Sequence, residues 1–88
     1  MKTKDIENEV VRKIVKTALQ HKFTVTFIDN KELGGQHFRI KKQDMGGYDA
    51  FSALARYMKI PEEELNGKVD TKHPAFIFYK DSFIVAGL

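Results

Sequence analysis

The sequence predicts an α+β domain in which an antiparallel four-stranded sheet, made of two hairpins, packs against two helices. Two segments carry apolar residues at helical spacing, and four short segments are rich in β-branched and aromatic residues. The expected order is α-β-β-α-β-β, with a short helical turn at 61–66. No linker or internal repeat interrupts the 88 residues, so we expect a single domain over 1–88.

The first helix is expected over residues 4–20. Its apolar residues recur at steps of one, three and four, which places them on one broad stripe, and Thr3 is suited to cap the first turn. Because many of them are β-branched, packing rather than intrinsic propensity should stabilise this helix. The stripe contains Ile6, Val10, Val11, Ile14, Val15, Ala18 and Leu19.

A first hairpin is expected from strands at 23–28 and 36–42, joined by a loop that ends in Gly34 and Gly35. Strand alternation divides each strand into an apolar face and a polar face. The predicted core positions are Phe23, Val25, Phe27, Phe38 and Ile40, and the opposite face carries Thr24, Thr26, His37, Arg39 and Lys41.

The second helix is expected over residues 48–59, where four apolar residues fall at i, i+3, i+4 and i+7. Pro61 ends this helix, because the residue before a proline avoids the α-helical region. The acidic run that follows suits the positive end of the short helical turn at 61–66. The four apolar positions are Phe51, Leu54, Ala55 and Met58.

The second hairpin is expected from strands at 75–79 and 83–88, around a short turn at 80–82. Its strands differ from the first pair because they are apolar on both faces. Such strands need cover on both sides or a central place in the sheet. An apolar face left uncovered would be expected to bind a partner.

Composition limits the kinds of function that the chain can have. It contains no cysteine, which excludes a disulfide framework, a cysteine nucleophile and a thiolate metal site, and which favours a cytoplasmic protein. No apolar run is long enough to span a bilayer, and no secretory signal follows the N-terminus. Fifteen Lys and Arg against twelve Asp and Glu give a net charge of +3, which permits nucleic-acid contact without requiring it.

No catalytic or metal-binding constellation is visible in the sequence. His21, His37 and His73 lack the i, i+3 or i, i+4 spacing to each other or to a carboxylate that marks a helical metal pair. Neither serine lies in a Gly-x-Ser-x-Gly setting. We therefore expect a protein that is not an enzyme and that carries no cofactor or metal. A site that joins His37 to His73 in space is the remaining catalytic alternative.

The preferred hypothesis is a non-enzymatic protein-interaction module that uses the second hairpin. Self-association as a homodimer is the simplest case, and capture of another protein is the next. The hypothesis depends on the apolarity of both faces of these strands. The residues expected to bind the partner are Phe76, Phe78, Tyr79, Phe83 and Ile84.

The alternative hypothesis is nucleic-acid binding through the polar face of the first hairpin. A basic sheet face can follow a phosphate backbone, although this hairpin supplies no exposed aromatic residue of its own for base stacking. Basic residues on an edge strand also keep it soluble. The candidate residues are His37, Arg39, Lys41 and Lys42.

Overall fold

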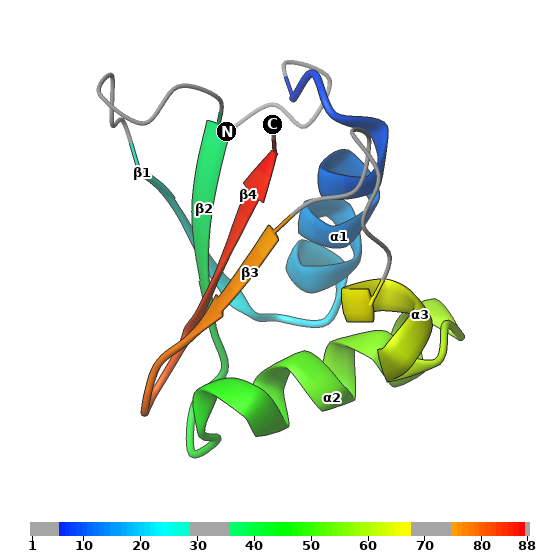
Figure 1. Ribbon diagram of the computed structural model, residues 1–88. Coiled ribbons are helices and arrows are strands. Elements are labelled where there is room, and N and C mark those ends of the chain that lie inside the picture. Colours follow the sequence, from blue (N-terminus) through cyan, green and yellow to red (C-terminus); the bar gives the residue numbers. More distant parts are fainter. Residues whose placement is uncertain (1–5, 29–35, 68–74, 88) are drawn as a thin grey trace.

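The computed structural model describes residues 6–28, 36–67 and 75–87, and it confirms the predicted α+β class and the order of the elements. A short third helix follows the second one, at the predicted helical turn (Figure 1). The elements are α1 (Glu9–Gln20), β1 (Thr24–Ile28), β2 (Gln36–Lys41), α2 (Gly47–Met58), α3 (Glu62–Gly67), β3 (Ala75–Phe78) and β4 (Phe83–Gly87).

The four strands form one antiparallel sheet in the order β1-β2-β4-β3. The two hairpins are joined where β2 pairs with β4, with Phe38 opposite Val85 and Arg39 opposite Ile84. The strand β4 is therefore central and β3 forms an edge, as does β1. A central position explains why β4 is apolar on both faces. The helices cover one face, and on the other face side chains of β2 and β3 flank those of β4.

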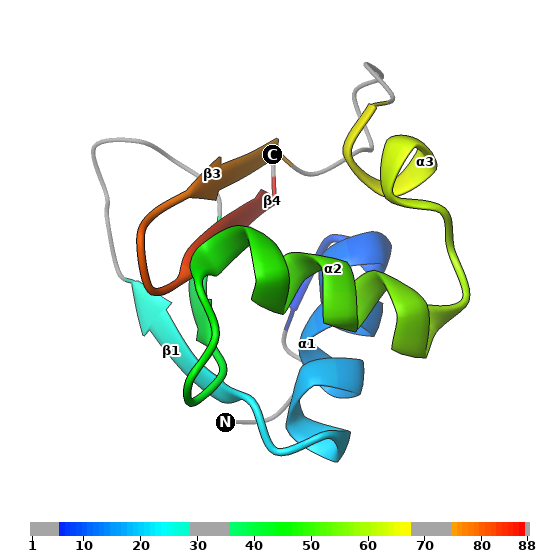
Figure 2. The same cartoon turned by 90° about the horizontal axis from the view of Figure 1, so that it is seen from below.

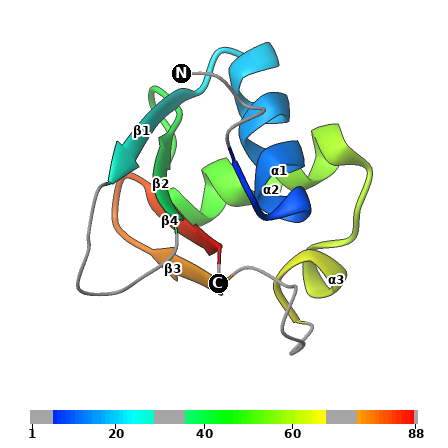
Figure 3. The same cartoon turned by 90° about the horizontal axis from the view of Figure 1, so that it is seen from above.

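Both long helices lie on the same face of this sheet (Figures 1 and 3). Figure 2 shows α2 running across one end of the sheet, where the backbone N–H of Gly47 donates to the carbonyl of Lys80 in the β3–β4 turn at 3.2 Å. Alternation in the strands sends one set of side chains toward the helices. Its fully buried members are Phe38, Ile40, Phe83 and Val85.

The helix α1 begins later than the sequence pattern predicts, at Glu9 rather than near residue 4. The cause is Asn8, whose side-chain oxygen accepts hydrogen bonds from the N–H groups of Val10 and Val11 at 3.0 and 3.1 Å. Ile6 is nevertheless buried, in a segment that precedes the helix, and its carbonyl accepts two hydrogen bonds from the Arg12 guanidinium. The predicted cap, Thr3, lies outside the described residues.

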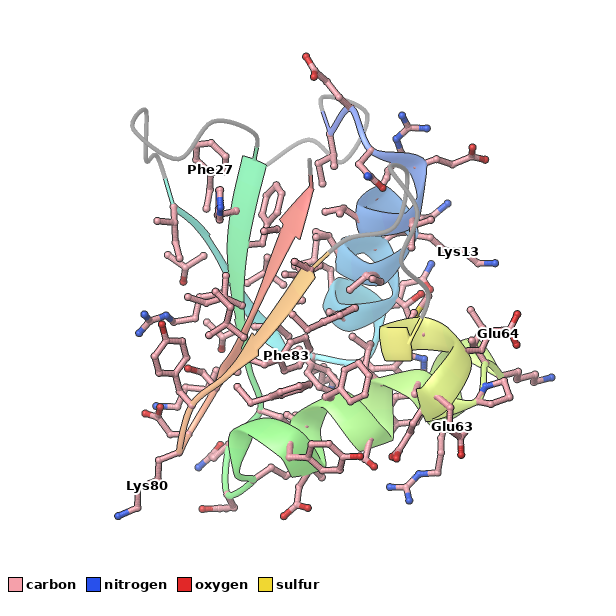
Figure 4. The ribbon with its side chains drawn as sticks, in the orientation of Figure 1. Lys13, Phe27, Glu63, Glu64, Lys80 and Phe83 are labelled. Atoms are coloured by element: carbon pink, nitrogen blue, oxygen red, sulfur yellow. The ribbon has the colours of Figure 1, made fainter. Side chains whose placement is uncertain are left out.

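The helix α2 ends at Lys59, which adopts the left-handed conformation with φ of 60°. The chain then turns back so that α3 packs beside α2 and buries Leu65. The hydroxyl of Tyr48 donates to the carboxylate of Glu62 at 3.1 Å. This hydrogen bond, and the negative charge of Glu62, raise the pKa of the Tyr48 hydroxyl above its ordinary value. Figure 4 shows Glu63 and Glu64 on the outer side of α3.

The prediction that Phe27 lies in the core is wrong. Phe27 is 49% exposed, although its ring lies 5.4 Å from that of Phe38. Figure 4 places it toward one end of the sheet, away from α2, so its side chain lacks the helical cover that buries Phe38. In the described part of the chain, no helix is long and apolar enough to cross a membrane.

Candidate functional site

The sheet has one face turned away from α1 and α2, which we call the helix-free face (Figure 3). Strand pairing sets its composition, because side chains at paired positions point to the same side. Three rows cross the sheet in this way: Ile28, His37, Ala86 and Ala75; Thr26, Arg39, Ile84 and Ile77; and Thr24 with Lys41. Tyr79 follows β3 on the same side.

The structure divides the predicted partner-binding residues of the second hairpin between the two faces. Phe76, Phe78 and Phe83 point toward the helices, and their ring centroids lie 5.0, 5.2 and 5.8 Å from that of Phe51. Phe83 is 0% exposed, and Figure 4 shows it between the sheet and the helices. Phe83 therefore contributes to the core, and the chain's own helices cover that side of the hairpin.

The other two residues of this predicted set belong to the helix-free face. Ile84 is buried at the centre of the sheet, between β2 and β3, whereas Tyr79 is 47% exposed. Ile77, which the prediction omits, is also 47% exposed. In the described part of this hairpin, the large apolar side chains that are exposed are therefore Ile77 and Tyr79, at the edge of the sheet.

The predicted basic residues also divide into groups. Arg39 and Lys41 are exposed on the helix-free face, but His37 is only 8% exposed and its Nδ1 has no hydrogen-bond partner among the described residues. Lys42 points to the helical side, where its Nζ donates to the carbonyl of His21 at 3.1 Å. Lys41 lies 3.6 Å from the carboxylate of Asp81, and both side chains are more than half exposed, so this ion pair contributes little to stability.

The central contact of the helix-free face joins the two hairpins. The Arg39 guanidinium carbon lies 5.5 Å from the centroid of the Tyr79 ring, which is a cation–π distance. The exposed ring of the first hairpin, Phe27, is paired with Phe38 and so points to the helical side of the sheet. Tyr79 therefore supplies an exposed aromatic ring on the helix-free face. The sequence gives no direct signal for this contact, because Arg39 and Tyr79 come together only through the pairing of β2 with β4 and of β4 with β3.

The described strands contribute only positive charge to the helix-free face, and Asp81 of the β3–β4 turn lies at its margin, paired with Lys41. Arg39 and Lys41 are its exposed cations, and none of the three rows contains an acidic residue. Thr24 and Thr26 add exposed hydroxyl groups along β1. This combination offers cations, hydrogen-bonding hydroxyls and one aromatic ring on a single flat surface.

Residues 6–28, 36–67 and 75–87 contain no candidate metal centre. No group of three or more His, Cys, Asp or Glu side chains in these ranges could hold a metal ion. His73, the proposed partner of His37 in a catalytic site, lies outside the described residues.

Comparisons with known proteins give no match to this sequence or fold. No protein-family model matches the chain, and neither the curated proteins nor the solved structures include a significant match. Function is therefore inferred from the chemistry of the surface alone.

Proposed function

We propose that the protein binds single-stranded nucleic acid through the helix-free face. The observation that carries the proposal is the exposed Tyr79 ring beside the Arg39 guanidinium, on a sheet face whose described strands contain no acid. Proteins that bind single strands combine cations that follow the phosphates with aromatic rings on which bases stack. The presence of an aromatic ring and cations on the same face supports the nucleic-acid hypothesis.

Each group on this face has a chemical role in the proposal. Arg39 and Lys41 pair with phosphate oxygens, and the guanidinium can do so with two parallel N–H donors. Tyr79 stacks against a base. Thr24 and Thr26 donate hydrogen bonds to phosphate or sugar oxygens, which position the strand without reading its sequence.

The shape of the face favours a single strand over a duplex. Reading a major groove requires a protruding helix or a two-stranded ribbon. Here both long helices lie on the other side of the sheet (Figure 1), and the exposed side chains of the helix-free face come from β1, β2 and the β3 edge. An extended strand with unstacked bases can lie along such a surface, as sheet faces with exposed aromatic residues allow in other proteins.

Tyr79→Ala tests the stacking interaction. We expect it to weaken the binding of a labelled single-stranded oligonucleotide by about 1–3 kcal/mol, measured by fluorescence anisotropy. Arg39→Ala should also lower the affinity at low salt, and it should reduce the steepness of the plot of log affinity against log salt concentration, the salt slope, by about 0.7 for each phosphate that the variant no longer neutralises. Lys13→Ala is the matched control, since Figure 4 shows Lys13 on the outer side of α1, away from the sheet.

Two results would contradict this function. The first is no measurable binding of single-stranded DNA or RNA by the unmodified protein at low salt. The second is binding that Tyr79→Ala and Arg39→Ala weaken no more than Lys13→Ala does, because a generally cationic surface would respond equally to the removal of any one positive charge.

Self-association through β3 is the second candidate, and a specific observation favours it. Among the described strands β3 pairs with β4 alone, and Ile77 is half-exposed on this edge strand. Edge strands with apolar side chains are templates for pairing with a second copy. An antiparallel β3–β3 contact about a twofold axis would extend the sheet and double the helix-free face.

Ile77→Lys tests self-association, because a cation on an edge strand opposes strand pairing. In sedimentation experiments over a concentration series, the average mass of the unmodified protein should rise toward that of a dimer. The Ile77→Lys protein should keep the mass of a monomer. A monomeric mass for the unmodified protein throughout the series would remove this candidate and leave nucleic-acid binding untouched.

A further inference from the structure

A second aromatic and basic cluster lies where α1 ends and β1 begins. We call it the α1-end patch, and its members are His21, Lys22, Phe23, Lys42 and Tyr57. The rings of His21 and Tyr57 are stacked, with centroids 3.8 Å apart and planes inclined by 7°. Both residues are exposed, and Phe23 supports Tyr57 from below through an edge contact at 6.3 Å. The stack is a flat, supported platform at the protein surface.

Two cations flank this platform. Lys42 lies with its Nζ 5.4 Å from the centroid of the Phe23 ring while it donates one hydrogen bond to the His21 carbonyl. An ammonium group has three donors, so it retains the capacity to bind a phosphate oxygen. Lys22 is exposed and adjacent to His21 in the chain. The five residues of the patch include these two cations and no acid, so the patch carries a net positive charge.

The backbone at Lys22 supports a role for its side chain. Lys22 adopts a left-handed conformation with φ of 64°, which glycine reaches more easily than any residue with a Cβ atom. The fold would be served at least as well by glycine at this position. A lysine instead holds a positive charge beside the His21–Tyr57 stack.

The patch is separated from the acidic surface of α3. Tyr48 and Tyr57 lie nine positions apart on α2, which at about 100° per residue places them on opposite sides of the helix. Tyr48 is the residue that contacts Glu62 of α3. The acidic groups of α3 therefore lie on the far side of α2 from the stack, where they do not repel a phosphate bound at the patch.

The patch also continues the helix-free face around the end of the sheet. Lys41, on the helix-free face, is paired with Thr24, and the next residue, Lys42, reaches His21. From His21 the stack leads to Tyr57. The helix-free face and the α1-end patch are therefore adjacent at the end of β1 and β2, where the consecutive residues Lys41 and Lys42 point to opposite sides of the sheet.

We propose that the α1-end patch is a second contact region for the same single-stranded nucleic acid, so that the strand passes from the helix-free face around the end of the sheet. This inference rests on the proposed function. A base stacks on the outer surface of the His21–Tyr57 pair, and Lys22 and Lys42 bind the phosphates on either side. The binding site is consequently longer than the helix-free face alone can accommodate.

The test compares labelled oligo(dT) and oligo(U) of about 4 and about 12 nucleotides, since single-strand sites of one small domain fall in this range. The unmodified protein should bind the longer probes more tightly. His21→Ala should weaken binding of the longer probes at least about fivefold and leave the shorter ones unchanged. Lys22→Gly should reduce the salt slope for the longer probes by about 0.7.

The choice of variants keeps folding separate from binding. Lys22→Gly removes the charge at a position where glycine suits the backbone, so we expect no loss of stability. His21→Ala removes an exposed ring, and thermal denaturation of both variants checks that they fold. Lys13→Ala is again the charge-matched control and should not change the length dependence.

The outcomes separate the two proposals. If His21→Ala and Lys22→Gly bind the longer probes as the unmodified protein does, the patch has no role in binding and the extended path is overturned. Equal affinity of the unmodified protein for short and long probes would overturn it as well. If instead the short probes bind and respond to Tyr79→Ala but not to His21→Ala, the helix-free face is supported independently of the patch. No binding of either length removes both.

Discussion

Phe83→Ala is expected to lower the free energy of unfolding by about 3–5 kcal/mol. Phe83 is 0% exposed, and its ring packs against Phe51 with centroids 5.8 Å apart and against Phe76 at 6.3 Å. Removing the ring deletes buried apolar surface and leaves a cavity that the sheet and α2 can fill only in part. The total free energy of unfolding of a domain of this size is about 5–10 kcal/mol, so the variant should be close to unfolding at ambient temperature.

Urea denaturation monitored by circular dichroism measures this loss directly. The matched control is Ile77→Ala on the neighbouring strand, where the side chain is half-exposed and the expected loss is well under that of Phe83→Ala. If Phe83→Ala kept the stability of the unmodified protein but no longer bound a protein partner, the interpretation of Phe83 as core would be wrong. The partner-binding role that the sequence predicts for the hairpin would then return.

Gly47→Ala is expected to destabilise the protein by about 1–3 kcal/mol or more, because the added methyl group would overlap backbone atoms. A Cβ atom at this position would collide with the carbonyl oxygens of Tyr79 and Ser82 in the β3–β4 turn. This loss of stability is opposite in sign to the usual effect, since replacing a glycine by alanine inside a helix normally stabilises a protein by about 1 kcal/mol. The close approach is what allows the first turn of α2 to lie directly against the second hairpin.

The neighbouring glycine provides the control for this prediction. At Gly46 a Cβ atom would meet the Lys80 carbonyl oxygen at 3.3 Å, a tight contact that a small shift relieves. Gly46→Ala should therefore cost much less than Gly47→Ala in the same denaturation experiment. A Gly47→Ala protein as stable as the unmodified one would mean that α2 does not rest on the β3–β4 turn.

The helices and strands themselves can be predicted from local patterns in the sequence. The alternation of Phe38 and Ile40 with Arg39 and Lys41 predicts both a strand and its two faces, and the burial of these residues agrees. The apolar stripe with Phe51 and Leu54 predicts α2 and its buried side in the same way. Such patterns are readable because a side chain's direction depends only on its neighbours a few residues away.

The residue at which a helix begins, and the burial of side chains near the edges of the sheet, are less predictable from the sequence. The hydrogen bonds of Asn8 start α1 several residues later than its apolar stripe suggests. Phe27 continues the alternation of β1 but lies beyond the cover of the helices. In both cases a specific contact, or the lack of one, outweighs the periodic pattern.

The sequence by itself therefore determined the strands, the helices, their order and the polar face of β2. Only the tertiary structure decided which of the aromatic residues are available to a partner. The pairings of β2 with β4 and of β4 with β3 bring Tyr79 beside Arg39, and the packing of the helices against one face of the sheet buries Phe83. The physical reason is that strand order depends on contacts between segments distant in the sequence, and no local pattern records which strands become neighbours.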